Sequence, residues 1–423
     1  MPPGHRQGSA PATGLLVIVY LIALAGLAAP SRAEEPKNIA AVVTAYFHNS
    51  HADVIVSRLL EGYTLDGKGP RPALRLVSLY TDQTPANDKS RKLAEQHGFK
   101  IYDTVAGALT QGGDQLAVDG VLLVAEHGEY PTSPTGQVQY PKRRLFGEIA
   151  AVFRDSQRSV PVFIDKHLAD NWQDAKWIYD TARELHAPLM AGSSLPVLWR
   201  YPPADVPRGT KLREIVGVSY HSLDAYGFHG VEMVQCLAER RQSGETGVRA
   251  VQCLTGPAVW QAGERGMYDP RLLDAALARL RDRRGGDKPL AEIVPDPVLF
   301  QIEYTDGLKA SLLTLNGAVA EWAAAWRDAD DHVSSTLFWT QEARPLMHFT
   351  YLVQGIGAMF QTGRPTWPVE RTLMTSGLLD TLLISKQGGG TRLETPYLDI
   401  RYQTEWDWRQ PPPPPPGRPF TEQ

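Results

Sequence analysis

Cysteine is nearly absent from this sequence: Cys236 and Cys253 are the only two among 423 residues. So few cysteines exclude a disulfide-stabilised scaffold. The two could pair in an oxidising compartment or remain buried thiols, because the sequence does not give the distance between their Cα atoms. An excess of positive charge is also lacking, since 43 basic side chains face 47 acidic ones and the formal net charge is -4. We therefore expect no nucleic-acid partner.

A hydrophobic run long enough to cross a membrane is lacking as well. The run LLVIVYLIALAGLAA has 15 residues, fewer than the roughly 20 that a spanning helix needs. Pro30 follows it, and the segment SRA then makes residues 1–33 typical of a signal peptide cleaved after Ala33, with an uncleaved anchor as the alternative. We expect an exported protein, periplasmic or extracellular, with no stable membrane span once the signal is removed.

Strand-like and helix-like segments alternate from residue 38 to about residue 195. Short apolar runs such as NIAAVVTAY and VDGVLLVAEHG are separated by amphipathic segments such as HADVIVSRLLEG and RRLFGEIAAVFRDS. This alternation is typical of a parallel sheet covered by helices. We predict an α/β fold with a Rossmann-like domain at 34–195. Glycine-bounded strands then predict an α+β domain with a largely antiparallel sheet at 196–405, before a proline-rich tail at 406–423.

Polar residues follow four of the predicted strands, at 44–50, at Asp82, at 126–129 and at 165–168. In an open parallel sheet, ligands bind beyond the carboxyl ends of the strands. We therefore expect these four groups, which are far apart in the sequence, to lie close together in space.

Four stretches, in order along the chain, carry a resemblance to a known family. They are HADVIVSRLL, LVSLYTDQ with SRKLAEQHGFKIYDTVAGAL, VPVFIDKHLADNWQDAKWIYDTARELHAPLMAG, and YGFHGVEMVQCL. From about residue 38 to residue 402 the chain resembles the Gfo/Idh/MocA oxidoreductases, including their Glu-Lys-Pro segment and the histidine-bearing helix of their substrate domain. The resemblance implies hydride transfer between a nicotinamide, NAD or NADP, and a carbon of a sugar or cyclitol.

The resemblance also implies roles in the substrate site. Lys166 stands where the family has the lysine of Glu-Lys-Pro, and a cation there stabilises an alkoxide-like transition state. His229 stands where the family has its substrate-domain histidine, and an imidazole can exchange a hydroxyl proton near neutral pH. Glu232 lies one helical turn beyond His229, and Asp224 and Tyr226 precede it, so these three would bind substrate hydroxyls.

The stretch VVTAYFHNSHAD contains no glycine where the family has a glycine-rich turn. Glycines let the backbone approach a pyrophosphate at a helix N-terminus, and Tyr46 and Phe47 would occupy that space. Asp82 takes the position of the ribose-binding acid, and His167 replaces the family's proline. The resemblance implies a cofactor site that comprises Thr44, Tyr46, His48, Asn49, Asp82, Glu126, His127 and Asp165.

The missing glycines leave two other functions open. One is a non-catalytic carbohydrate-binding protein on the same scaffold. The other is a metal-assisted sugar lyase or hydrolase that would use His48, His51, Asp53, Glu126, His127 and His167. The H-x-x-H spacing of His48 and His51 does not make a zinc site by itself, and our assignment of site residues includes no metal ligand.

Two further patterns bear on function and assembly. No G-x-S-x-G motif is present, which argues against serine hydrolysis. Trp322 and Trp326 in EWAAAWRD have the spacing of one helical face, which is typical of packing. Among partners, we expect a sugar or cyclitol, with a homo-oligomer as an open alternative to a monomer.

Overall fold

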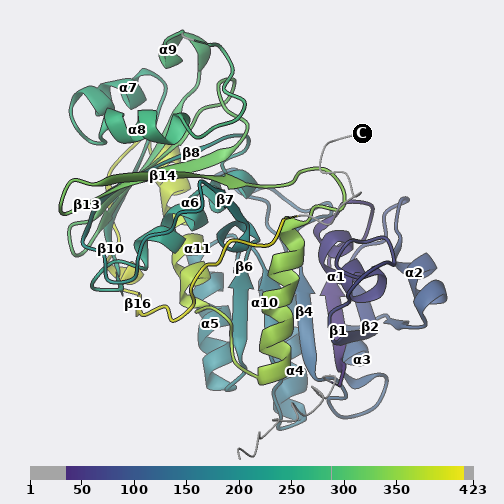
Figure 1. The fold of residues 1–423 in the computed structure, drawn as a ribbon. Helices are drawn as coiled ribbons and strands as arrows, with labels where there is room; N and C mark the ends of the chain where they lie inside the picture. Colours follow the sequence, from purple (N-terminus) through teal and green to yellow (C-terminus); the bar gives the residue numbers. More distant parts are fainter. Residues whose placement is uncertain (1–34, 287, 414–423) are drawn as a thin grey trace, which may run out of the picture. The chain divides into compact units, whose positions relative to one another are not determined.

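The computed structural model describes residues 35–286 and 288–413, so the predicted signal peptide at 1–33 lies outside the described residues. From Pro36 onward the chain forms one compact unit built around two large sheets (Figure 1). Within the described ranges, no helix is both long enough and apolar enough to span a bilayer.

The first sheet has six parallel strands in the order β3-β2-β1-β4-β5-β6. The strands are β1 Lys37–Val43, β2 Leu74–Thr81, β3 Lys100–Tyr102, β4 Gly120–Val124, β5 Val162–Asp165 and β6 Leu189–Gly192. The connecting helices are α1 His51–Glu61, α2 Ser90–His97, α3 Val105–Thr110, α4 Lys142–Asp155 and α5 Trp172–Glu184. The predicted Rossmann-like arrangement is confirmed.

Burial explains why the strands of this sheet are apolar throughout. Alternate residues of β1 face two different cores: Ile39 and Ala41 pack with α1, whereas Ala40 and Val42 pack with α3 and α4. Strands covered on both faces need apolar side chains at every position. The carboxyl ends of these strands are left as the edge where polar side chains gather.

The second sheet has eight strands in the order β15-β10-β11-β12-β8-β13-β14-β7. They are β7 Trp199–Tyr201, β8 Leu212–Ser219, β10 Val248–Thr255, β11 Val298–Tyr304, β12 Lys309–Thr314, β13 Trp322–Asp328, β14 Val333–Trp339 and β15 Leu393–Glu394. All neighbours are antiparallel except β8 and β12. The predicted largely antiparallel sheet is confirmed. The helical spacing of Trp322 and Trp326 was misleading, because both lie on β13.

Helices cover both faces of this second sheet. Helices α6 Ala225–Ala238 and α11 Glu370–Gln387 pack on one face, and α7 Pro257–Glu264 and α8 Pro270–Leu277 pack on the other (Figure 1). The remaining elements are β9 Glu245–Thr246, β16 Arg401–Tyr402, α9 Leu290–Ile293, and the short 3-10 helices Leu195–Val197 and Pro396–Leu398. Cys236 and Cys253 are free buried thiols, and burial raises the pKa of each to about 12.

Helix α10 His348–Thr362 returns from the second half of the chain to the parallel sheet. Phe349, Ile356 and Phe360 share one core with Ile39 and Ile55 of the first sheet and α1. The start of α10 thereby lies next to the carboxyl edge of the parallel strands. The predicted boundary at residue 195 stays a prediction.

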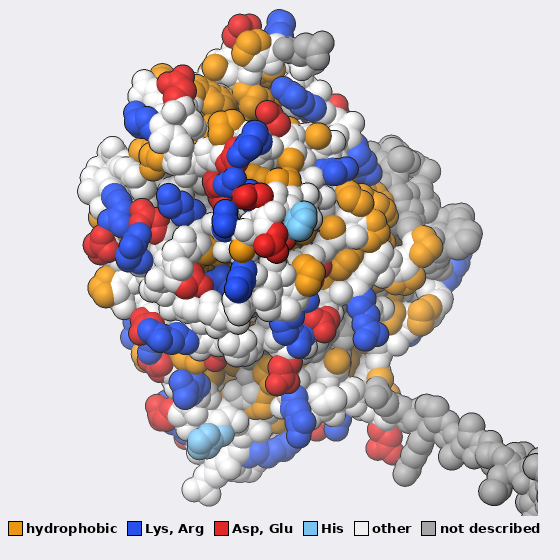
Figure 2. All heavy atoms as spheres, turned by 60° about the vertical axis from the view of Figure 1, so that its left-hand side comes forward, with side chains coloured by type: hydrophobic (Ala, Val, Ile, Leu, Met, Phe, Trp, Pro, Cys, Tyr) orange, Lys and Arg blue, Asp and Glu red, His pale blue; other side chains and the backbone are white. Residues whose placement is uncertain are grey.

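On the face of the molecule in Figure 2, no large area of the described surface carries charged side chains of only one sign. Figure 2 shows basic and acidic side chains intermingled over it, as the nearly balanced composition predicts. The described part of the predicted tail, 406–413, has no helix or strand. It packs against the chain, since Trp408 donates to the Leu198 carbonyl and Trp199 donates to the Pro412 carbonyl.

Candidate active site

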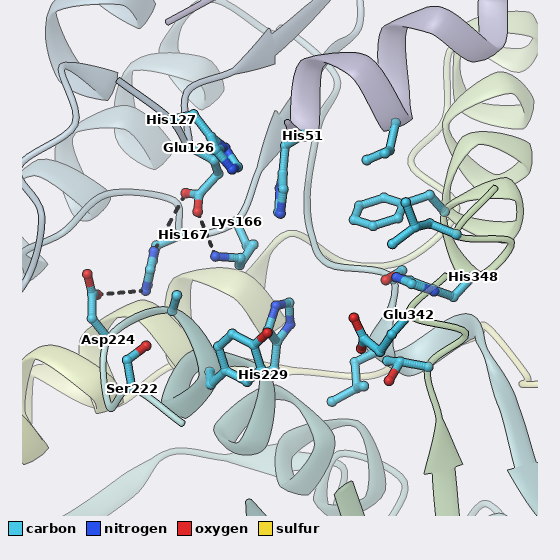
Figure 3. Close-up of a pocket in the computed structure, with 18 of the residues that line it drawn as sticks. His51, Glu126, His127, Lys166, His167, Ser222, Asp224, His229, Glu342 and His348 are labelled. Carbon is cyan, nitrogen blue, oxygen red and sulfur yellow. Dashed lines mark hydrogen bonds and ion pairs between the residues drawn. The ribbon is translucent and has the colours of Figure 1, made fainter. Parts of the chain in front are cut away.

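A cavity of about 510 Å³ lies between the carboxyl edge of the parallel sheet and the mixed sheet. This volume falls within the roughly 300–1,000 Å³ of typical small-molecule pockets. Its walls come from both halves of the chain, as Figure 3 shows for His51 of α1, Glu126 and His127 after β4, Lys166 and His167 after β5, His229 of α6 and His348 of α10. The strand-end residues therefore gather as expected. Three of the four groups contribute to the cavity wall, and Asp82 lies beside them, because its N–H donates to the Val43 carbonyl and its carboxylate accepts from Tyr130.

Glu126 lies between two buried lysines. Its carboxylate accepts hydrogen bonds from Lys166 Nζ at 2.6 Å and from Lys142 Nζ at 2.8 Å. Burial alone would raise the pKa of Glu126, but the two ammonium groups hold it well below its ordinary value. Lys142 is bound further by the carbonyls of Asp165 and His167. The cluster is thus a carboxylate with one anchored cation and one cation that faces the cavity.

Lys166 is the cation at the cavity wall. Burial alone would lower its pKa, but the charges of Glu126 and Asp165 outweigh burial and raise the pKa above its ordinary value. The lysine is therefore an ammonium group at neutral pH. Burial of Lys142 lowers its pKa, and Glu126 opposes that shift only in part.

His167 connects this cluster to the substrate side of the cavity. Its Nε2 lies 3.3 Å from Asp224 Oδ1 and its Nδ1 lies 3.8 Å from Glu126 Oε1. The other oxygen of Asp224 accepts the Val138 N–H at 3.0 Å. Asp224 and Tyr226, both predicted to bind substrate, lie in the cavity wall.

His229 is held from behind by a serine and a glutamate. Its Nδ1 lies 3.0 Å from Ser193 Oγ, and the same hydroxyl is hydrogen-bonded to Glu232 and accepts the Leu195 N–H at 3.1 Å. A hydroxyl has one donor and two acceptor sites. Ser193 donates its hydroxyl proton to Glu232 and accepts the Leu195 N–H with one lone pair. Its second lone pair therefore accepts from His229 Nδ1–H, and Nε2 is the basic nitrogen of His229.

The surroundings keep the His229 ring neutral. Burial lowers the pKa of His229 well below its ordinary value, and the Lys166 charge adds to that shift. Burial also raises the pKa of Glu232, which is 1% exposed and lies behind the histidine rather than in the cavity wall. Glu232 thus contacts Ser193, the residue that holds His229. The contact between Glu232 and substrate stays a prediction.

His51 is held by a carboxylate directly. Its Nδ1 lies 2.5 Å from Oδ2 of Asp165, a fully buried side chain. The His51 ring also contacts His127, with ring centroids 5.2 Å apart, and Phe349, with centroids 5.3 Å apart. The aspartate predicted to bind the cofactor thus orients a cavity histidine, and its role in cofactor binding stays a prediction.

Two aromatic side chains form another part of the wall. Tyr226 stacks on Trp322 with ring centroids 5.3 Å apart and an interplanar angle of 21°. The His229 ring makes a T-shaped contact with the same indole, with ring centroids 5.6 Å apart. Flat aromatic surfaces beside hydrogen-bonding groups suit a ligand with an apolar ring face and a polar rim.

Three backbone N–H groups of the turn between β1 and α1 are already bound by the chain. The Phe47 N–H donates to Ser50 Oγ, the Asn49 N–H to Asp53 Oδ2, and the Ser50 N–H to the Phe47 carbonyl. Asp53 itself is buried and accepts from Lys89 at 2.6 Å and Arg344 at 2.7 Å. The Asp53 carboxylate therefore already binds one backbone donor and two cations near this helix N-terminus.

The predicted cofactor residues of this turn point in different directions. Tyr46 is fully buried and bonds Ser57 of α1 at 2.7 Å, and Thr44 is also buried. The side chain of His48 is 63% exposed. Asn49 lines the cavity, and its side-chain oxygen accepts from Arg344. Their roles in cofactor binding stay predictions.

Asp82, at the predicted ribose position, is also engaged by the chain. It accepts from Tyr80 at 2.8 Å, from Tyr130 at 2.7 Å and from Arg144 at 2.5 Å. Burial alone would raise the pKa of Asp82, but these three donors lower it. Asp82 does not line the cavity.

The loop after β4 contacts both the turn between β1 and α1 and the segment that follows β2. Gln83 exchanges two hydrogen bonds with the backbone of Glu129, and the Phe47 ring meets the His127 ring edge-on at 5.3 Å. We call residues 44–50, Asp53, Asp82, Gln83 and 128–130 the nucleotide region. No buried side-chain nitrogen or oxygen of these residues lacks a hydrogen-bond partner.

The predicted metal ligands do not form a common site. His48 faces Asp53 at 4.0 Å, whereas His51 turns to Asp165. Among residues 35–286 and 288–413, the three potential ligands close enough to share an ion are Asp328, Asp330 and His332, at the turn after β13.

Several residues of the site escaped sequence reasoning. Ser193 follows β6 at the same carboxyl edge, so strand-end position could have signalled it. Lys142 is one of three basic residues in PKRR, and the cavity residues His348 and Trp322 come from distant segments with no local motif. Burial lowers the pKa of His348 to about 3.

No family model and no curated protein matches the chain in sequence. Solved structures do match its fold. GenD2 from gentamicin A biosynthesis, crystallised with NAD, has a TM-score of 0.56 at 14% identity and covers 87% of this chain and 99% of its own. Myo-inositol 2-dehydrogenase from Lactobacillus plantarum has a TM-score of 0.50 at 11% identity, covering 85% and 99%. Apo scyllo-inositol dehydrogenase from Lactobacillus casei has 0.51 at 9%, covering 85% and 98%.

These likenesses show the fold. The chain has the fold of these dehydrogenases, and its four motifs predicted a fold of this kind. Identities this low say nothing more about the chemistry of the chain.

Proposed function

We propose that this chain is an enzyme that binds a sugar or cyclitol in the cavity and moves a proton at one of its hydroxyl or carbonyl groups. His229 acts as the acid/base and Lys166 as the cation beside the reacting oxygen. The observation that carries the proposal is a neutral imidazole and a buried ammonium group, each held by its own partners, in the wall of one cavity. The similarity of the fold to inositol dehydrogenases supports the substrate class.

The polar atoms of the cavity support a ligand with many hydroxyls. His127 Nδ1, His348 Nδ1 and Trp322 Nε1 are buried and have no hydrogen-bond partner among the described residues. Buried polar atoms are normally paired, so atoms left over in a cavity are available to a ligand. The aromatic pair Tyr226 and Trp322 supplies the flat surface on which a sugar ring packs.

The proton transfer follows from the arrangement around His229. Because Nδ1 donates to Ser193, the lone pair on Nε2 can accept the proton of a substrate hydroxyl. The oxygen that loses it becomes an alkoxide, and a preorganised ammonium group such as Lys166 stabilises that charge in a site with little water.

Oxidoreduction by hydride transfer to NAD or NADP is the second candidate, favoured by the fold and by the presence of Lys166 and His229 at the positions that the resemblance implies. The nucleotide region does not fit a dinucleotide, however. The N–H groups of Phe47, Asn49 and Ser50 are already bound, and Asp82 is bound by three side chains. No step of the proposed mechanism therefore depends on a nicotinamide.

Two measurements on the purified chain test these functions. A rise in melting temperature with myo-inositol, D-glucose or keto-sugars that Tyr226→Ala abolishes would support the sugar site, and no shift with any of them would overturn it. Fluorescence titration with NADH and NADPH separates the candidates. Saturation in the micromolar range would favour hydride transfer, whereas none up to millimolar concentration would favour chemistry without a dinucleotide.

The non-catalytic alternative is tested in the same preparation. Binding of sugars without turnover of any of them, in the presence or absence of nucleotide, would favour a binding protein. We also propose export from the cytoplasm, supported by the apolar run and the SRA segment within residues 1–33. Mass spectrometry of secreted protein should find a chain beginning at Glu34.

A further inference from the structure

Two histidines of the cavity are each fixed through the same ring atom. His51 Nδ1 is held by Asp165 at 2.5 Å, and His229 Nδ1 is held by Ser193 at 3.0 Å. In both rings Nε2 is the nitrogen that remains for a ligand, and both rings line the cavity. Figure 3 shows His51 and His229 on opposite sides of Lys166, one above it and one below it in that view.

The holding groups of the two rings differ in charge. Asp165 is a fully buried carboxyl group in direct contact with His51. Such a contact fixes the tautomer and the orientation of the ring, so that Nε2 faces away from the carboxyl group. His229 meets a hydroxyl instead and has Lys166 nearby, which favours the neutral ring. The cavity therefore holds two oriented imidazoles with different partners.

We propose that His51, held by Asp165, is a second catalytic acid/base, and that His51 and His229 exchange protons with opposite faces of one substrate carbon while Lys166 stabilises the enolate between them. The reaction is the inversion of a carbon next to a carbonyl group in a keto-sugar or keto-cyclitol. This inference rests on the proposed function, because it needs the sugar cavity.

The electrons and protons of this reaction balance without a cofactor. His229 Nε2 takes the proton from carbon as the C–H bond breaks. The C–H electron pair forms a carbon–carbon double bond, and the carbonyl π pair moves to the oxygen beside the Lys166 ammonium group. The enolate then collapses, and the carbon takes a proton from His51 Nε2 on its other face. The carbonyl reforms, nothing is oxidised or reduced, and the two rings exchange one proton with water before the next turnover.

The state of the nucleotide region agrees with such a reaction. A 1,1-proton transfer needs no hydride acceptor, so nothing would maintain an open nucleotide groove. In this chain, Asp53 instead accepts from the Asn49 N–H and from Lys89, and Asp82 accepts from Arg144. The loop after β4 is hydrogen-bonded to Gln83. The cavity, in contrast, keeps buried polar atoms without partners in the described part of the chain at His127, His348 and Trp322.

Isotope exchange tests the proposal directly. The purified chain is incubated in D₂O with D-fructose, D-psicose or 2-keto-myo-inositol, without nucleotide, and the C–H signals next to the carbonyl are followed by NMR. We expect deuterium at that carbon, with inversion, in at least one of the three. No exchange from any compound that binds the cavity overturns the two-histidine mechanism and leaves the sugar site standing, whereas no binding at all overturns the proposed function itself.

Single variants then give a signature that a structural role would not produce. His51→Asn and His229→Asn should each slow inversion by roughly 10²-fold or more. Each variant should still exchange the C–H of one epimer, and the two variants should retain opposite epimers. His97→Asn, at the exposed end of α2, is the matched control and should behave as the parent chain. Loss of exchange from both epimers in both variants, with melting temperatures unchanged, would overturn the assignment of one face to each histidine.

Discussion

The nucleotide region and the cavity share the carboxyl edge of one sheet, yet they treat polar groups in opposite ways. In the nucleotide region, Asp53 and Asp82 are each bound by at least three donors of the chain. In the cavity, His127, His348 and Trp322 keep buried polar atoms without partners among the described residues. The difference teaches that a conserved scaffold position is a poor guide to a ligand, whereas unfilled hydrogen-bonding capacity is a better one.

The largest effect is expected from the centre of the cavity wall. Glu126→Gln removes the carboxylate that is ion-paired with both Lys142 and Lys166, so both buried ammonium groups lose their direct ion-pair partner. Breaking a buried ion pair costs about 3–5 kcal/mol. Urea unfolding at pH 7.5 measures the loss. Glu148→Gln removes an exposed partner of Arg144 and should cost less than about 1 kcal/mol; equal losses would contradict a structural role for the buried cluster.

As the pH is lowered, the cavity should begin to destabilise the folded chain at a higher pH than the nucleotide region does. Burial lowers the pKa of His348 to about 3, whereas the unfolded chain takes up its proton near 6.5. Stability is therefore fully present above pH 6.5 and falls as the pH drops toward 3, by about 2 kcal/mol for this ring between pH 7.5 and 5. Asp53 and Asp82 have lowered pKa values, so their contribution is lost only below about pH 4.

Urea unfolding at pH 7.5 and at pH 5 measures that difference. His348→Phe removes the titrating ring and should reduce the pH dependence by the stated amount. A variant with the full dependence of the parent chain would show that His348 is protonated in the folded state.

The Ser193→Ala variant distinguishes a residue that positions His229 from a residue that contacts the ligand. It removes the hydroxyl that links His229 to Glu232. We expect kcat to fall by about 10- to 100-fold, as for other groups that orient a catalytic residue, with KM nearly unchanged. Steady-state kinetics on a compound that the isotope test identifies would measure both constants. Ser193→Thr keeps the hydroxyl and should recover most of the rate, and a rise in KM alone would point to substrate contact instead.

The smallest effect is expected in the nucleotide region. Asp82→Asn weakens a partly exposed pair with Arg144, and such pairs contribute roughly 0–1 kcal/mol. Thermal unfolding should change little, and sugar binding should not change at all. A large loss of sugar binding in this variant would break the distinction between the two regions.

Much of the scaffold could be predicted because its signals are local. Strand and helix alternate with clear periods, and the motifs around Lys166 and His229 lie within single elements. The strand-end rule brought Glu126, His127 and Lys166 to one edge. It did not foresee Asp82 bound by Tyr130 and Arg144, since those contacts depend on how the loop after β4 folds back.

Some errors had a physical cause that sequence could not reveal. Trp322 and Trp326 have helical spacing, but residues four apart also share a face of a strand, and pairing with β8 and β14 decided for the strand. Sequence also could not reveal that Asp165 holds His51, because His51 lies 114 positions earlier in the chain.

The sequence by itself determined the parallel sheet, the mixed sheet and the presence of Lys166 and His229 at expected places, because periodicity and short motifs act over a few residues. Only the tertiary structure decided which polar groups are already satisfied and which face a cavity. That choice depends on contacts such as Asp53 with Arg344, His229 with Ser193 and His51 with Asp165. Each of these joins residues far apart in the chain, and a hydrogen bond needs its two atoms within about 3 Å in space.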